Sequence, residues 1–190
     1  MKIGNALAAA LLAATPLANA VVTVYTTPLA PEATGATGSG SATFTYDDSL
    51  RTLGISASFS GLSGTTTVAH IHCCVATAGV GTVGVAVMPP TLPGFPAGVS
   101  AGSYDAVIDL SLDASYAGAF LTASGGTSDD AERALIDGIN AGKAYLNIHT
   151  STFGGGEIRG FLAPIPEPAT YALMLMGLLG VGAAARRGSC

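Results

Sequence analysis

Two neighbouring stretches of the chain alternate apolar and polar side chains with a period of two residues. The first covers residues 42–46 and the second covers residues 53–59, and an Asp-Asp-Ser turn lies between them. Successive side chains of a β-strand point to opposite faces, so this pattern predicts an antiparallel hairpin with one buried face. A chain built around such a hairpin must cover its apolar face with further strands or helices.

The remaining local patterns predict more strands and one well-defined helix. Thr127 or Ser128 is a suitable N-cap for a helix over residues 129–140, which Gly142 would end. A shorter helix is predicted over residues 114–122. The run 28–41 is rich in Pro, Gly, Ala, Thr and Ser and is predicted to be a loop. Strands are predicted over residues 21–26, 65–72, 83–88, 104–112, 144–149 and 158–162.

These elements predict a mainly all-β fold, a Greek-key-like antiparallel β-sandwich or barrel with one or two short inserted helices. The composition agrees with a turn-rich β domain, since only 10% of the residues are charged and Gly occurs 26 times. The net charge of −5 argues against nucleic acid as a partner, because nucleic acid selects clustered Lys and Arg.

The N-terminus has the three parts of a secretory signal. Lys2 is followed by an apolar run over residues 3–17 and then by Ala18-Asn19-Ala20, which fits a signal peptidase site. We therefore expect residues 1–20 to be removed after Ala20; an ordinary N-terminal helix is the alternative. Export would place the rest of the chain in an oxidising compartment.

The C-terminus contains a second apolar segment. Residues 169–185 carry no charge, follow Pro166-Glu167-Pro168 and precede Arg186-Arg187. At about 1.5 Å per residue this stretch reaches roughly 25 Å, barely enough to cross the hydrocarbon of a bilayer. It predicts a transmembrane helix whose C-terminal end lies in the cytoplasm.

The order of these parts resembles the PEP-CTERM sorting signal, to which we assign residues 164–190. The resemblance implies an exosortase-like membrane protease that cleaves near Pro166, Glu167 and Pro168. An inner-membrane-anchored precursor would then be released to the cell surface or an extracellular matrix. Exopolysaccharide is a third candidate partner there, although the chain has no Trp and no stripe of aromatic side chains to support such binding. A permanent single-span anchor is the alternative.

Most of the side chains that could bind a metal lie in two short segments. His70 and His72 fall in a predicted strand, where alternation puts them on one face about 7 Å apart at Cα. His149 lies near the end of another predicted strand. Three imidazoles could bind copper or zinc. The alternative is that these histidines are structural and hydrogen-bond strand ends and turns.

Four neighbouring residues could extend such a site. Cys73 or Cys74 could add a sulfur ligand, and Asn147 and Glu157 could orient an imidazole from outside. The cysteines have other options, namely a disulfide between neighbours, which we favour, or an intermolecular link. Cys190 would leave with the sorting segment, so no distant intramolecular partner would remain.

The two histidine segments also carry a family resemblance. Ala69-His70-Ile71-His72, together with the later segment that runs from Asn147 through His149 to Gly160, resembles the CHRD domain, a module named after chordin. The resemblance covers residues 21–163 and implies an extracellular β-rich domain. Antagonism of growth factors is not implied, because it depends on other modules of chordin.

The sequence therefore supports two functions. The first is a non-enzymatic structural or binding module of the cell surface or extracellular matrix, and the second is a copper- or zinc-binding extracellular domain with redox activity. No catalytic residues are assigned, because the chain has no Gly-x-Ser-x-Gly elbow and no Lys-containing phosphate loop. Metal analysis separates the two functions.

Overall fold

The computed structural model describes residues 21–165. The expected signal segment 1–20 and the expected transmembrane helix 169–185 lie outside the described residues. Within 21–165, none of the helices has both the length and the apolar character needed to cross a bilayer.

Nine strands of the described part of the chain form one antiparallel sheet. Their order across the sheet is β5-β4-β7-β8-β1-β2-β3-β6, and β9 pairs with β1 beside this path. The strands are β1 (Val22–Pro31), β2 (Ser39–Asp47), β3 (Thr52–Ser60), β4 (Thr66–His72), β5 (Val85–Val87), β6 (Gly102–Asp109), β7 (Tyr145–Thr150), β8 (Ile158–Phe161) and β9 (Ala163–Pro164).

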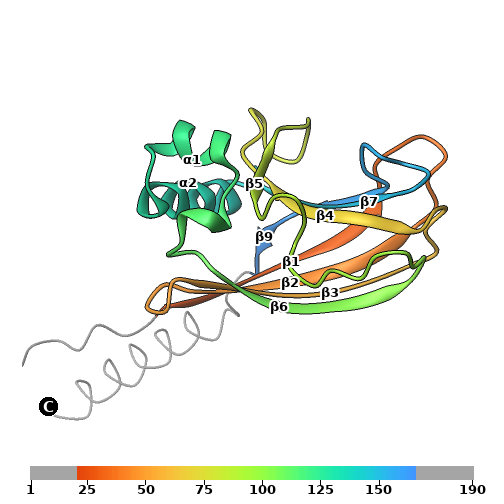
Figure 1. Ribbon diagram of the computed structural model, residues 1–190, viewed down its shortest axis with the longest axis horizontal. Helices are drawn as coiled ribbons and strands as arrows, with labels where there is room; N and C mark the ends of the chain where they lie inside the picture. The colour runs from red at the N-terminus through yellow and green to blue at the C-terminus, as the bar shows by residue number, and fades with distance from the viewer. Residues whose placement is uncertain (1–20, 166–190) are drawn as a thin grey trace, which may run out of the picture.

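The sheet curls into a half-barrel, with two short helices beside one end (Figure 1). The predicted mainly all-β, antiparallel class is thus confirmed, and it takes the form of one strongly curved sheet. The hairpin predicted from the period of two is β2–β3, in which Phe44 lies opposite Ile55 and both are buried.

The predicted helices are present with small changes in their limits. The longer one is α2 (Ser128–Asn140), and the Thr127 hydroxyl accepts a hydrogen bond from the Asp130 amide, as an N-cap does. The shorter prediction corresponds to a 3-10 turn, η1 (Asp113–Ser115), followed by α1 (Gly118–Ser124).

The loop prediction for residues 28–41 is wrong at both ends. β1 continues through Pro31, and β2 begins at Ser39. Proline cannot donate a main-chain hydrogen bond, which made the segment look unlike a strand. Pro28 nevertheless fits, because it pairs with Ser41 of β2 and has no partner on the β8 and β9 side of β1.

Two other strands differ in extent from the prediction. The strand predicted over 83–88 is reduced to β5, which has only three residues. The strand predicted over 104–112 is shifted to 102–109, because Ser111 turns back and donates to the Asp109 carboxylate from both its amide and its hydroxyl.

The core lies on the concave side of the half-barrel. Inward side chains of the strands meet the apolar side of α2 there, and five fully buried examples from different elements are Phe44, Leu53, Ile71, Leu135 and Leu146. Burying these side chains is the main favourable contribution to the stability of the fold.

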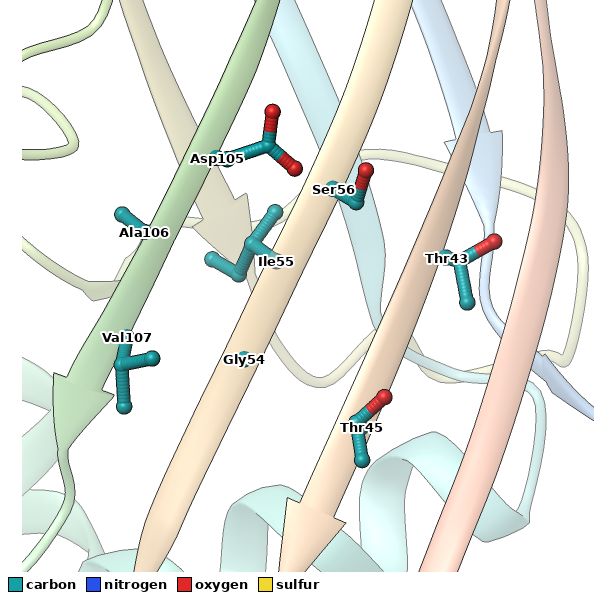
Figure 2. Close-up of a pocket in the computed structure, with 8 residues that line it drawn as sticks. All are labelled: Thr43, Thr45, Gly54, Ile55, Ser56, Asp105, Ala106 and Val107. Carbon is teal, nitrogen blue, oxygen red and sulfur yellow. The ribbon is translucent and has the colours of Figure 1, made fainter.

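The outer face of β2, β3 and β6 is exposed and mostly polar. Figure 2 shows side chains of β2 and β6 on either side of β3, where Gly54 and Ser56 leave a shallow hollow. The hollow has a volume of about 410 Å³, and Asp105 is the one charged residue that lines it. It is far in the sheet order from the histidine-bearing strands, and nothing in its chemistry resembles a metal site.

Candidate metal centre

Neighbouring strands β4 and β7 bring the three histidines together. In the register of these strands, His70 lies opposite Asn147 and His72 lies opposite Tyr145. The residues between them, such as Ile71 and Leu146, are fully buried in the core. Strand alternation therefore places His70 and His72 together on the face of the sheet opposite to these core residues, and a shared face is what the sequence predicted.

The three imidazole rings form one compact cluster. The ring centroid of His70 is 5.8 Å from that of His72 and 5.2 Å from that of His149. One ring nitrogen from each residue can be chosen so that all three nitrogens lie within 4.8 Å of one another. His70 Nδ1 and His149 Nε2 are 3.3 Å apart.

The other nitrogen of each ring contacts a main-chain carbonyl oxygen. His70 Nε2 lies 2.5 Å from the Pro90 oxygen, and His72 Nδ1 lies 2.7 Å from the Val83 oxygen. His149 Nδ1 lies 2.9 Å from the Gly154 oxygen. A carbonyl oxygen only accepts, so each of these nitrogens must carry a proton.

This assignment determines what the inward nitrogens can do. A neutral imidazole has a single N–H, and here that N–H is used for the carbonyl contact. His70 Nδ1, His72 Nε2 and His149 Nε2 are thus left as three lone pairs that converge. His72 Nε2 is buried and has no hydrogen-bond partner among the described residues. Converging lone pairs repel one another unless a cation lies between them.

Burial favours the neutral form of two of these rings. His70 and His72 are 8% and 9% exposed. Removal from water lowers the pKa of both side chains below the usual value of histidine, against the raising effect of their carbonyl contacts. At neutral pH the free nitrogens of His70 and His72 are therefore unprotonated, which is the state in which an imidazole binds a metal.

Tyr145, which was not among the predicted site residues, supports the cluster. Its ring stacks on that of His72, and its hydroxyl lies 3.3 Å from the Val83 amide, next to the carbonyl that His72 contacts. The guanidinium of Arg159 lies 5.2 Å from the centre of the Tyr145 ring on β7. The period of two residues in β7 places Tyr145 on the same face as His149, and this pattern could have identified Tyr145 as a neighbour of the histidines.

Asn147 and Glu32 form a polar group beside the histidines. The Asn147 amide donates to Glu32, and Arg159 Nη1 lies 3.2 Å from the other oxygen of that carboxylate. The side chain of Asn147 therefore contacts Glu32, whereas the sequence suggested contact with an imidazole. Burial raises the pKa of Glu32, against the lowering effects of Arg159 and His149. In the sequence, Glu32 is the only charged residue between Val21 and Tyr46, and no motif marks it as a site residue.

Glu157 also has partners other than the histidines. Its carboxylate accepts hydrogen bonds from the Thr150 hydroxyl at 2.6 Å and from the Ser63 amide at 2.5 Å. Glu157 is fully buried, and these contacts hold the β7–β8 connection against the segment before β4. Glu157 thus holds the loop that carries the Gly154 carbonyl, and that carbonyl contacts His149. The sequence had suggested a direct contact between Glu157 and an imidazole.

Cys73 and Cys74 form a disulfide with each other, the option that we favoured. A sulfur in a disulfide is not a thiolate, and thiolate is the form that binds metals. The cysteines are thus not ligands in this state, and the candidate cluster among residues 21–165 consists of the three histidines. The disulfide packs against Gly138 of α2, so it belongs to the contact between sheet and helix.

The fold and the site define an antiparallel β domain with three histidines on two paired strands. A family model for the CHRD domain matches residues 15–162, which is most of the chain, and the protein belongs to the CHRD family. A second model, for the PEP-CTERM protein-sorting motif, matches residues 164–187. Comparisons with curated proteins and with solved structures gave no significant match.

The two matches together identify an exported protein that is sorted in the cell envelope by exosortase-type machinery.

Proposed function

We propose that this exported CHRD domain is a binding module that holds one copper or zinc ion through His70 Nδ1, His72 Nε2 and His149 Nε2. The observation that carries the proposal is the convergence of three ring nitrogens, on rings whose other nitrogens each contact a main-chain carbonyl oxygen. Hydrogen bonding of the outer nitrogen is the usual way in which proteins orient a metal-binding imidazole.

The distances suit a metal ion of this kind. Zinc binds imidazole nitrogen at about 2.0–2.1 Å, which separates two ligands of a tetrahedral ion by about 3.3–3.4 Å. The observed distance of 3.3 Å between His70 Nδ1 and His149 Nε2 falls in that range. Neutral imidazole is a preferred ligand of both copper and zinc.

Three protein ligands would leave a fourth position for water or another small ligand. His149 is more exposed than the other two histidines, so the open position lies on its side of the cluster. With copper in the site, a change of oxidation state would add redox activity to binding. With zinc, the site would be purely a binding or structural one.

Metal analysis with a matched control tests the proposal. We expect one equivalent of copper or zinc per chain after equilibration with the metal and removal of the excess. The variant His149→Ala should lose the metal at least about tenfold more readily, since one of three ligands is gone. Thr67→Ala, which alters an exposed neighbour on β4, should bind as the natural chain does. Equal metal content in all three proteins, or none in any, would overturn the proposal.

We also propose the details of processing that the sequence suggested. Signal peptidase would remove residues 1–20, and an exosortase-like protease would cleave near Pro166, Glu167 and Pro168. The match to the sorting motif over residues 164–187 supports the second cleavage. Mass spectrometry of the secreted form should find a chain that begins near Val21 and lacks residues 169–185. A secreted product that keeps this segment would contradict the proposal.

A further inference from the structure

Large apolar side chains gather on one end of the domain. Seven of them are exposed within residues 21–165, and six lie near the turn between β2 and β3 or near the two ends of the described chain. These six, which we call the apolar end, are Val21, Val22, Leu50, Val107, Leu112 and Ile165.

The strand register shows that these residues share one edge of the sheet. Val22 lies opposite Asp47, Asp47 opposite Thr52, and Thr52 opposite Asp109. Four adjacent strands therefore have one end at this edge: β1 and β3 begin here, and β2 and β6 end here. Together they are about 15 Å wide across the sheet. Leu50 lies in the turn that joins two of them, and Leu112 lies just beyond the last.

Several of these side chains are among the most exposed apolar groups of the domain. Leu50 is 68% exposed and Val107 is 70% exposed. Val107 lies on the outer face of β6, close to where that strand ends (Figure 2). Single exposed apolar residues are common, but a cluster of this kind at one end marks a contact surface.

The chain enters and leaves the domain at the same end. The amide of Ile165 donates to the carbonyl oxygen of Val24, so residue 165 lies beside the start of β1. In Figure 1 the described chain both begins and ends near this end of the sheet. Only Pro166, Glu167 and Pro168 separate Ile165 from the uncharged stretch 169–185. Three residues allow at most about 14 Å between the Cα atoms of residues 165 and 169.

We infer that in the anchored precursor the apolar end rests on the lipid bilayer. The inference rests on membrane insertion of residues 169–185 and not on the metal site. The short connection holds the domain within about 14 Å of the membrane, so even weak apolar contacts form at a high effective concentration. The contact would orient the domain. The histidine cluster lies on β4 and β7, outside the four strands that end at the apolar end, and would face away from the lipid.

The charges near the apolar end favour zwitterionic lipid as the surface. Asp47, Asp48 and Asp109 flank the exposed Val22 and the turn that holds Leu50. Arg51 lies in the same turn, but its guanidinium is paired with Asp129 and Glu132. Carboxylates are repelled by anionic headgroups, so a surface of phosphatidylcholine is the suitable probe.

Single tryptophans can test the orientation, because the chain has no Trp of its own. The full chain would be reconstituted in phosphatidylcholine vesicles that contain brominated lipid, which quenches nearby indole fluorescence. Residues that sit at the headgroup boundary lie about 5–10 Å deep, so Leu50→Trp and Leu112→Trp should be quenched at least about twofold more than Val80→Trp. Val80 is the matched control, since it is 56% exposed but lies in the loop near the histidines.

Two further measurements make each outcome decisive. Leu175→Trp, within the apolar stretch, must be quenched, since the inference fails if this stretch does not enter the bilayer. Quenching at positions 50 and 112 should not change when the protein is diluted in the lipid, because lipid and not a second copy of the chain causes it. Equal quenching of Leu112→Trp and Val80→Trp, or quenching that appears only at high protein density, would overturn the inference.

Discussion

The ring of Tyr145 lies parallel to the ring of His72, with 4.8 Å between the centroids and an interplanar angle of 1°. The Tyr145 hydroxyl also contacts the main chain of Val83, whose carbonyl oxygen holds His72 Nδ1. A single side chain thus fixes both the plane of a candidate ligand and the loop that sets its tautomer.

We therefore predict that Tyr145→Ala weakens metal binding by about 10–100-fold, the usual cost of losing a supporting residue at a metal site. Tyr145→Phe keeps the stacked ring and loses only the hydroxyl, so its effect should be smaller. Competition with a chelator of known affinity measures both variants. Equal affinities of Tyr145→Ala and the natural chain would show that the stacking has no role in binding.

A second prediction concerns the pH dependence of stability at Glu157. Burial alone would raise the pKa of this carboxyl, but hydrogen bonds from Ser63, Thr150 and Gly64 outweigh burial and lower the pKa below its usual value. A lowered pKa means that the ionised form contributes stability above the ordinary pKa of glutamate, and that this contribution is lost as the pH falls through the folded-state pKa.

Glu157→Gln should accordingly reduce the free energy of unfolding by about 1–3 kcal/mol at pH 7. The difference between the two proteins should shrink as the pH is lowered from about 5 towards 3. Urea denaturation at a series of pH values measures it. A difference that stays constant over this range would mean that the charge of Glu157 is not responsible.

The sequence predicted the face of the histidines better than their surroundings. A period of two residues places His70 and His72 on one side of β4 whatever the rest of the fold is. The carbonyl contacts come from Val83, Pro90 and Gly154, which lie in irregular loops. Loop paths depend on packing between distant segments, so no local pattern predicts them.

The same limit explains why Glu32 was missed. It follows the two prolines of β1, in a stretch whose composition is that of a loop. Glu32 lies beside β8 and Arg159 because Pro31 pairs with Ile158, and these two residues are more than a hundred positions apart in the sequence. Strand periodicity contains no information on which strands become neighbours.

A third prediction tests the contact between the disulfide and α2. A methyl group at Gly138 would overlap the sulfur atoms of both Cys73 and Cys74. Gly138→Ala should therefore destabilise the fold by about 1–3 kcal/mol, as overpacking does, although alanine is normally the better helix residue. Gly118→Ala is the matched control in α1, because nothing lies within 4 Å of the added carbon there, and it should be neutral or slightly stabilising. Thermal unfolding compares the two, and equal melting temperatures would contradict the close packing.

The last prediction concerns the ion pairs that attach α2 to the sheet. Glu132 is buried on α2, where its carboxylate accepts from the Tyr46 hydroxyl at 2.8 Å and from Arg51 Nε at 2.6 Å. Asp129 lies one turn earlier, and its carboxylate is 2.7 Å from Arg51 Nη2, but its side chain is 71% exposed. The two acids contact the same arginine in different environments.

Removal of the buried charge should therefore cost much more than removal of the exposed one. We expect Glu132→Gln to lower the free energy of unfolding by about 1–3 kcal/mol, because Arg51 loses its buried partner. Asp129→Asn should change it by less than about 1 kcal/mol, since water already screens that pair. Urea denaturation at neutral pH compares the two variants. If Asp129→Asn proved the more damaging, the anchoring of α2 would depend on the exposed pair, and the contact between Glu132 and Tyr46 would not be what holds the helix to β2.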